Sequence, residues 1–131
     1  MLTRSNLFET ARSRLKDAEV LLQSERYDGA VYVCGYAVEI ALKEKICRTL
    51  GWSEFPSTGG EFQKYQSFRT HDLDVLLHLS GVEEMIKTTK FSEWSNVNRW
   101  NPETRYDPVG SATLAKAEKM IQSAKVLLEA I

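Results

Sequence analysis

The sequence predicts an all-α protein, an up-and-down bundle of four or five helices, and three observations predict it. Apolar residues recur at spacings of three and four over three long segments, which is the period of an amphipathic helix. No segment shows the alternation of a half-buried strand. Short or moderate connections between long helices favour antiparallel packing. Because 131 residues are the usual size of one domain, we expect a single helical domain over residues 1–131.

The first helix is predicted from about Thr3 to Gln23. Its apolar stripe is Phe8, Ala11, Leu15, Ala18 and Leu22. This pattern is that of an ordinary surface helix that buries one side.

The second helix, Tyr27–Leu50, is unusual because it has apolar residues on two nearly opposite sides. The first stripe is Val31, Cys34, Gly35, Val38, Leu42 and Ile46. The second stripe is Val33, Tyr36, Ile40 and Cys47. A helix of this kind is either central in its own bundle or shared with another chain, and with so few helices available we expect the second stripe to form a homodimer interface. Gly35 costs about 1 kcal/mol relative to alanine inside a helix, so we expect another group to pack closely against it.

Residues 51–69 have no apolar period and hold one proline and three glycines. A loop of this length is uncommon in a compact domain unless it is mobile or functional. A short helix comes next, for which Thr70 suits the N-cap and Gly81 the end. Its inward residues are expected to be Leu73, Leu76 and Leu77, and a further helical turn or two is expected around Val82, Met85 and Ile86.

The segment from Lys90 to Gly110 is the most irregular. We expect one short helix in it, lined by Phe91, Trp94 and Val97, and we expect Pro102 and Pro108 to prevent a longer helix after it. The last helix is predicted over about Ser111–Ile131. Its apolar stripe is Leu114, Ala117, Ile121, Ala124, Leu128 and Ile131.

Composition and charge limit the function classes. The net charge of −1 argues against nucleic-acid binding by bulk charge, although it allows a local basic patch. No apolar run is long enough to span a bilayer, and the N-terminus lacks the apolar core of a signal peptide, so we expect a cytoplasmic protein with no membrane partner. The two cysteines have no CxxC context and suit buried thiols. No glycine-rich phosphate loop is present, and we expect no cofactor.

Several stretches taken together resemble one family. They are RYDGAVYVCGYAVEIALKEKI, then THDLDVLLHL, then RW and RYDP, and then a C-terminal helix rich in Ala, Lys and Leu. Their order and spacing resemble the HEPN family (higher eukaryotes and prokaryotes nucleotide-binding domain) over nearly the whole chain. The resemblance implies a bundle of four or five helices that usually pairs as a homodimer.

The nuclease members of that family carry an Rx4–6H pair near the dimer interface. Histidine exchanges a proton near neutral pH, and arginine neutralises the scissile phosphate. This chain has only His71 and His78, and no arginine precedes either at that spacing. We therefore do not expect ribonuclease activity by the family mechanism.

A cluster of arginines and aromatics in NRWNPETRYDP suggests a ligand site. Arg99, Arg105 and Tyr106 could grip a phosphate and stack a base. The structural alternative is that Trp100 and Tyr106 plug the end of the bundle while Arg105 pairs with a carboxylate.

Glu39 lies between the two stripes of the second helix and needs a partner if it is buried. The functional interpretation pairs Glu39 with Arg105 in a small polar pocket with Tyr36 and Tyr32. The structural alternative is an exposed Glu39 that pairs with Lys43 one turn later, a pair worth about 0.2–0.5 kcal/mol.

His71, at the start of a helix, is a further candidate for nucleotide or RNA binding, or for a hydrogen bond to a loop carbonyl. Its neighbours Asp72 and Asp74 do not match the spacing of a defined metal site, so we expect no metal.

Three functional hypotheses remain. The first is a non-catalytic or weakly nucleotide- or RNA-binding component of a prokaryotic toxin–antitoxin or defence system, for which the resemblance suggests a minimal nucleotidyltransferase as a partner protein. The second is a ribonuclease toxin with an atypical active site, such as His71 with Arg69 or Arg105. The third is a protein-interaction module without a ligand.

Overall fold

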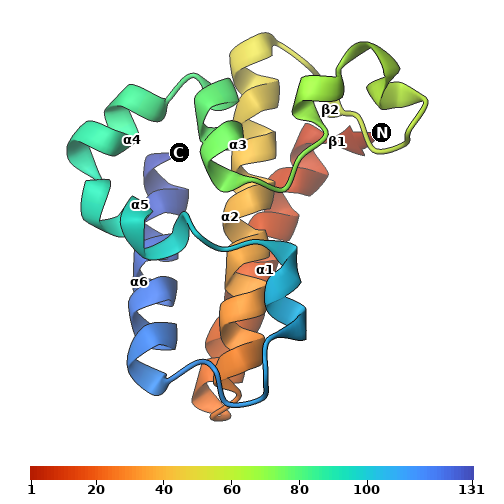
Figure 1. The fold of residues 1–131 in the computed structure, drawn as a ribbon. Coiled ribbons are helices and arrows are strands. Elements are labelled where there is room, and N and C mark those ends of the chain that lie inside the picture. The colour runs from red at the N-terminus through yellow and green to blue at the C-terminus, as the bar shows by residue number, and fades with distance from the viewer.

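The computed structural model describes residues 1–131 and confirms the all-α prediction (Figure 1). Its six α-helices are α1 Arg4–Gln23, α2 Tyr27–Leu50, α3 Leu73–Ser80, α4 Glu83–Thr89, α5 Phe91–Val97 and α6 Leu114–Ala130. The short 3-10 helices are η1 Glu61–Lys64, η2 Gln66–Phe68 and η3 Pro102–Tyr106. None of the helices has both the length and the apolar composition needed to cross a membrane.

Helix α2 lies at the centre of the bundle. It packs against α1, α3 and α6, and α1 and α2 run side by side in opposite directions (Figure 1). Every residue of the predicted first stripe of α2 is buried, from Val31 to Ile46. The two-sided apolar pattern is therefore explained in part within the chain itself, because α2 is surrounded by its own helices on more than one side.

Helix α1 uses a slightly different stripe from the predicted one. Leu7 is buried, whereas Phe8 is 44% exposed and carries the Arg12 guanidinium 3.5 Å from its ring centroid. Phe91 in α5 and Leu114 in α6, both predicted to lie inside, are also exposed. These three residues stand at the edges of their apolar stripes, where spacing alone does not separate buried from exposed positions.

The prediction that no strand is present is wrong in one detail. Two-residue strands β1 Leu2–Thr3 and β2 Glu54–Phe55 pair antiparallel, with Leu2 opposite Phe55. The alternation signal fails because two residues are too few to show a period. This pairing ties the start of α1 to the loop that comes after α2.

The loop over residues 51–69 is ordered around aromatic side chains. The ring of Trp52 lies 5.0 Å from that of Tyr65 and 5.1 Å from that of Phe68, and Phe55 lies 6.1 Å from Phe62. At its end Asp72 is the N-cap of α3, because its carboxylate accepts the backbone N–H groups of Asp74 and Val75. The predicted cap, Thr70, instead accepts the N–H of Asp72.

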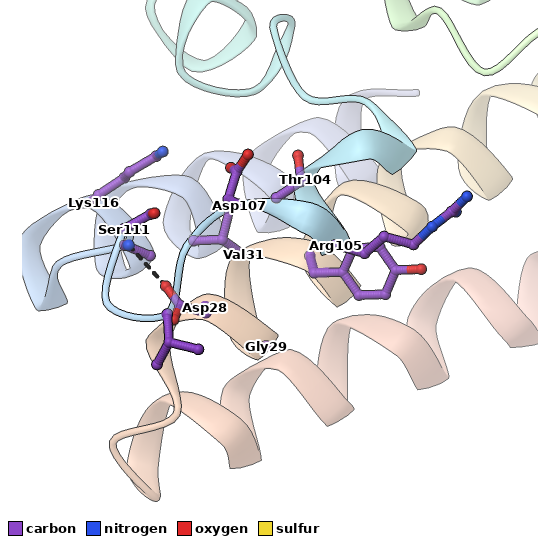
Figure 2. Close-up of a pocket in the computed structure, with 11 residues that line it drawn as sticks. Asp28, Gly29, Val31, Thr104, Arg105, Asp107, Ser111 and Lys116 are labelled. Carbon is purple, nitrogen blue, oxygen red and sulfur yellow. Dashed lines mark hydrogen bonds between the residues drawn. The ribbon is translucent and has the colours of Figure 1, made fainter.

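One carboxylate fixes the connection between η3 and α6. Asp28, in the first turn of α2, accepts the backbone N–H groups of Gly110 at 2.7 Å and Ala112 at 2.8 Å, and Figure 2 shows one of these two bonds. Donation by Gly110 and then by Ala112 lowers the pKa of Asp28 below its ordinary value of 3.8.

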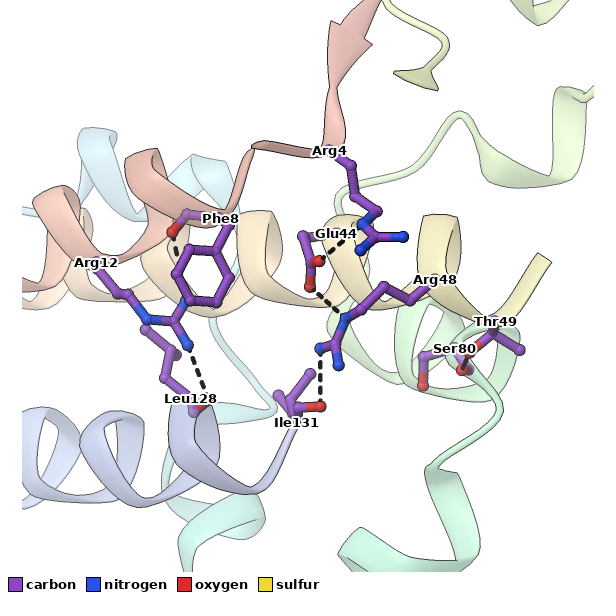
Figure 3. A network of polar contacts seen from close by, with 9 residues as sticks. All are labelled: Arg4, Phe8, Arg12, Glu44, Arg48, Thr49, Ser80, Leu128 and Ile131. Carbon is purple, nitrogen blue, oxygen red and sulfur yellow. Dashed lines mark hydrogen bonds and ion pairs between the residues drawn. The ribbon is translucent and has the colours of Figure 1, made fainter. Parts of the chain in front are cut away.

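A second polar network joins α1, α2 and the C-terminal end of the chain (Figure 3). The buried Glu44 accepts from Arg48 at 2.8 Å and pairs with Arg4 at 3.5 Å. Arg48 also donates to the carbonyl of Ile131 at 3.0 Å. A buried carboxylate needs such partners, and here they connect three parts of the bundle.

Candidate functional site

One side of α2 is left only half covered by the rest of the chain. We call it the open face of α2, and its residues are Tyr32, Val33, Tyr36, Ile40 and Lys43. They recur at helical spacings and are all of intermediate burial. The open face contains three of the four residues of the predicted second stripe.

Cys47, the fourth predicted interface residue, does not lie on this face. It is fully buried in its own chain, as is Cys34, so it is unavailable to a partner unless the bundle opens. Helical spacing placed it on the second stripe, but the neighbouring elements cover the helix at that level. The homodimer interface itself stays a prediction that rests on Val33, Tyr36 and Ile40.

Aromatic rings line the first half of the open face. The indole of Trp100 packs on Gly35, and a Cβ atom built there would lie 2.1 Å from the ring. Tyr36 stands edge-on to Trp100 at 4.8 Å and to Tyr32 at 5.2 Å between ring centroids. The predicted close packing at Gly35 is confirmed, and it is what lets the aromatic segment approach α2.

Arg105 lies beside these rings and not beside Glu39. Its guanidinium carbon is 4.8 Å from the ring centroid of Tyr106, and the phenol groups of Tyr106 and then Tyr32 raise the pKa of Arg105. Arg105 makes no ion pair within the chain. Burial, and next the hydroxyl of Tyr32, raise the pKa of Tyr36 to about 12. At neutral pH the cluster thus presents a fixed positive charge next to uncharged phenols.

A groove runs from this cluster along the η3 segment to α6. It consists of two adjoining pockets of about 240 and 290 Å³, which share Val31, Thr104, Asp107 and Lys116. Figure 2 shows the Arg105 guanidinium directed away from Asp28 and Lys116. Arg99 and Trp100 line the second pocket, so the two predicted arginines lie on the same groove.

The predicted anchors of the irregular segment behave differently from one another. Trp100 is 7% exposed and plugs the bundle as the structural alternative required, whereas Tyr106 is 71% exposed. Tyr106 is therefore free to meet a ligand. The sequence could not separate the two, because both come directly after an arginine in a segment without a period.

Glu39 is buried and has partners other than the predicted Arg105. Its Oε1 lies 2.7 Å from Nδ1 of His71, and its Oε2 accepts from Nζ of Lys43 at 3.2 Å. The structural alternative predicted the pairing with Lys43, which the structure shows, but it also predicted an exposed Glu39, which is wrong. His71 bonds this carboxylate and not a loop carbonyl. The predicted pocket of Glu39 with Arg105 is therefore wrong.

Two features of this second cluster were missed in the sequence. The Glu39–His71 hydrogen bond joins residues 32 positions apart, and no spacing rule relates a helix interior to the start of another helix at that separation. Lys43 and Ser57 line a common pocket with Arg69, Thr70 and His71, of which the sequence had brought together only Arg69 and His71. No group of three or more histidine, cysteine, aspartate or glutamate side chains is placed to hold a metal ion.

Comparison with known proteins finds one family model that matches the first part of the chain. Residues 5–60 match the family model described as the HEPN domain, and they span α1, α2 and the first part of the loop after α2. The match supports the resemblance predicted from the sequence over this part of the chain. No curated protein and no solved structure matches the chain.

Proposed function

We propose that this HEPN-domain protein binds RNA or a nucleotide through Arg105 and the aromatic groups beside it. The observation that carries the proposal is an exposed guanidinium without a carboxylate partner, held against Tyr106 and Tyr32. Arginine binds phosphate, and exposed aromatic rings stack on bases in single-stranded nucleic acid. Arg99, on the same groove, supplies a second cation.

The biological role that fits this site is a non-catalytic one. We propose a homodimer joined through Val33, Tyr36 and Ile40, acting in the cytoplasm as one component of a prokaryotic toxin–antitoxin or defence system. A minimal nucleotidyltransferase is its proposed partner protein, by family resemblance. All 131 residues are proposed to act as one domain, since a single cluster of buried apolar side chains runs from Leu7 to Ile131.

Binding of a fluorescently labelled single-stranded RNA, monitored by anisotropy at fixed salt, tests the site. Arg105→Gln is expected to weaken binding about tenfold or more, as does the loss of one charge-assisted phosphate contact. Arg14→Gln in α1 removes the same charge away from the site and is the control. If Arg105→Gln and Arg14→Gln bind the RNA with equal affinity, Arg105 is not part of the binding site. No binding of RNA or of nucleotides by the wild type would favour the interaction module.

One observation favours a ribonuclease as the second candidate. Glu39 holds Nδ1 of His71 at 2.7 Å, and Arg69 lines the same pocket. In that arrangement Nε2 can take the proton of a ribose 2′-hydroxyl while Arg69 neutralises the phosphate. RNA cleavage by the wild type that is lost in His71→Ala, with Arg105→Gln still active, would establish it over the binding protein.

A further inference from the structure

A pocket of about 430 Å³ lies at the Lys43 end of the open face of α2. Elements far apart in the sequence form it: β1, α2, the loop after β2, η1 and the segment before α3. Its volume falls in the usual range of small-molecule sites, about 300–1,000 Å³. We call it the His71 pocket.

The lining of the His71 pocket is basic. Lys43, Arg69 and His71 are the titratable groups among its eight lining residues, and none of the eight is acidic. Ser57 and Thr70 add hydroxyl groups. Glu39 contacts the pocket residues from inside the bundle, so with a neutral His71 the group of Lys43, Arg69 and Glu39 carries one net positive charge.

His71 is held in one orientation by the buried carboxylate. Glu39 is 3% exposed and contacts Nδ1 at 2.7 Å, whereas Nε2 has no hydrogen-bond partner within the chain. A carboxylate that binds one ring nitrogen fixes the ring and leaves the other nitrogen for a ligand. The imidazole side chain is 58% exposed, so a solute can reach it.

The two cations keep donors free. Arg69 makes no ion pair within the chain and lies 5.9 Å from the ring centroid of Phe62. Lys43 has three N–H donors and uses one of them on Glu39. Its side chain is 14% exposed, which limits competition from water.

We propose that the His71 pocket binds a phosphate group, either a terminal phosphate of a nucleotide or inorganic pyrophosphate. Arg69 and Lys43 supply charge, and the Thr70 hydroxyl can donate. Nε2 of His71 donates to a phosphate oxygen when the imidazole is protonated, because Nδ1–H is already bonded to Glu39. Converging donors of this kind suit a tetrahedral oxyanion better than they suit a planar carboxylate. The site is separate from the Arg105 cluster and does not depend on the function proposed for it.

The chain contains its own control for an experiment on this site. His71 and His78 are the only histidines, and His78 is 74% exposed and does not line the pocket. Inorganic pyrophosphate is titrated into the protein at constant pH, and the imidazole Hε1–Cε1 correlations of both residues are monitored by NMR. His78→Asn assigns the two signals. We expect a saturable shift of the His71 signal and none of the His78 signal.

Two charge-matched variants complete the test. Arg69→Gln is expected to weaken pyrophosphate binding at least about tenfold, whereas Arg14→Gln, in α1 and away from the pocket, leaves it unchanged. Both side chains are exposed, so both variants should fold, which circular dichroism checks. Equal shifts of the two histidines, a shift that does not saturate, or an unchanged affinity of Arg69→Gln overturns the proposal.

A parallel titration with ATP separates the sources of the phosphate. Tighter binding of ATP than of pyrophosphate, lost in Arg69→Gln, supports a nucleotide ligand. Equal or weaker binding of ATP supports recognition of the phosphate groups alone. A failure here leaves RNA binding at Arg105 intact, because the Arg105→Gln variant reports on that function separately.

Discussion

The indole ring of Trp100 occupies the space that a side chain at position 35 would fill. A Cβ atom on Gly35 would lie 2.1 Å from the ring, which is inside van der Waals contact. A helix-breaking residue in the middle of the central helix thus has a packing reason: it lets the segment that carries Arg105 lie on α2.

Gly35→Ala is therefore expected to destabilise the protein. Overpacking a filled site costs about 1–3 kcal/mol. Because the added Cβ would lie 2.1 Å from the Trp100 ring, this cost should exceed the gain of about 1 kcal/mol in helix propensity from glycine to alanine. Urea unfolding monitored by circular dichroism measures the change in the free energy of unfolding.

Gly29→Ala is the matched control for that experiment. Position 29 is also helical, but its Cβ would meet Leu21 at 3.5 Å, an ordinary contact. Alanine there should be neutral or stabilising by up to about 1 kcal/mol. A Gly35→Ala variant as stable as Gly29→Ala would contradict the packing of Trp100 on α2.

Stability should depend on the ionisation of Asp28 in acid. The bonds from Gly110 and Ala112 lower the folded-state pKa of Asp28, so its contribution is complete above the unfolded value. That contribution is lost as the pH falls through the folded-state pKa. The difference in unfolding free energy between wild type and Asp28→Asn should therefore shrink from about pH 6 to about pH 2.

Asp17→Asn is the control for the acid experiment, because Asp17 is exposed and accepts no backbone N–H bond. A difference between wild type and Asp28→Asn that stays constant over the whole pH range would show that the Asp28 carboxylate is not what holds the 110–112 backbone.

The two cysteines are expected to be unreactive in the folded protein. Both are fully buried, and burial raises the pKa of Cys34 to about 12, so the reactive thiolate is scarce at neutral pH. A chromogenic thiol reagent should label neither residue in buffer and both in urea. Rapid labelling of Cys47 in buffer would contradict its burial. It would show that Cys47 is accessible, as its place on the predicted second stripe required.

The proposed homodimer depends on the open face of α2. Wild-type protein should sediment as a dimer at micromolar concentration, and Val33→Glu should weaken association at least about tenfold, because burying one valine contributes about 1.5–3 kcal/mol. Val20→Glu, on the exposed side of α1, is the matched control. A wild-type protein that sediments as a monomer at this concentration would contradict the proposed interface.

Much of the fold is determined by local pattern. The predicted bounds of the three long helices, α1, α2 and α6, lie close to those of the structure, because long segments with a helical period constrain their own structure. The least accurate predictions concern stripe edges, such as Phe8, and short elements, such as the pair β1–β2, where few residues define the period.

Only part of the candidate site could be predicted from the sequence. Aromatic and basic residues close together in NRWNPETRYDP predicted the cluster at Arg105, and a glycine inside a helix predicted the close approach of a neighbour. The choice of partner for Glu39 was wrong, because it depends on where the start of α3 lies relative to α2.

By itself the sequence determined the long helices and the two-sided apolar pattern of the second one, since each depends on residues a few positions apart. Only the tertiary structure decided that the buried Glu39 contacts His71, that Cys47 is buried, and that Arg69 lines a pocket with Lys43. Such contacts join segments tens of residues apart, and their geometry is set by how whole helices pack.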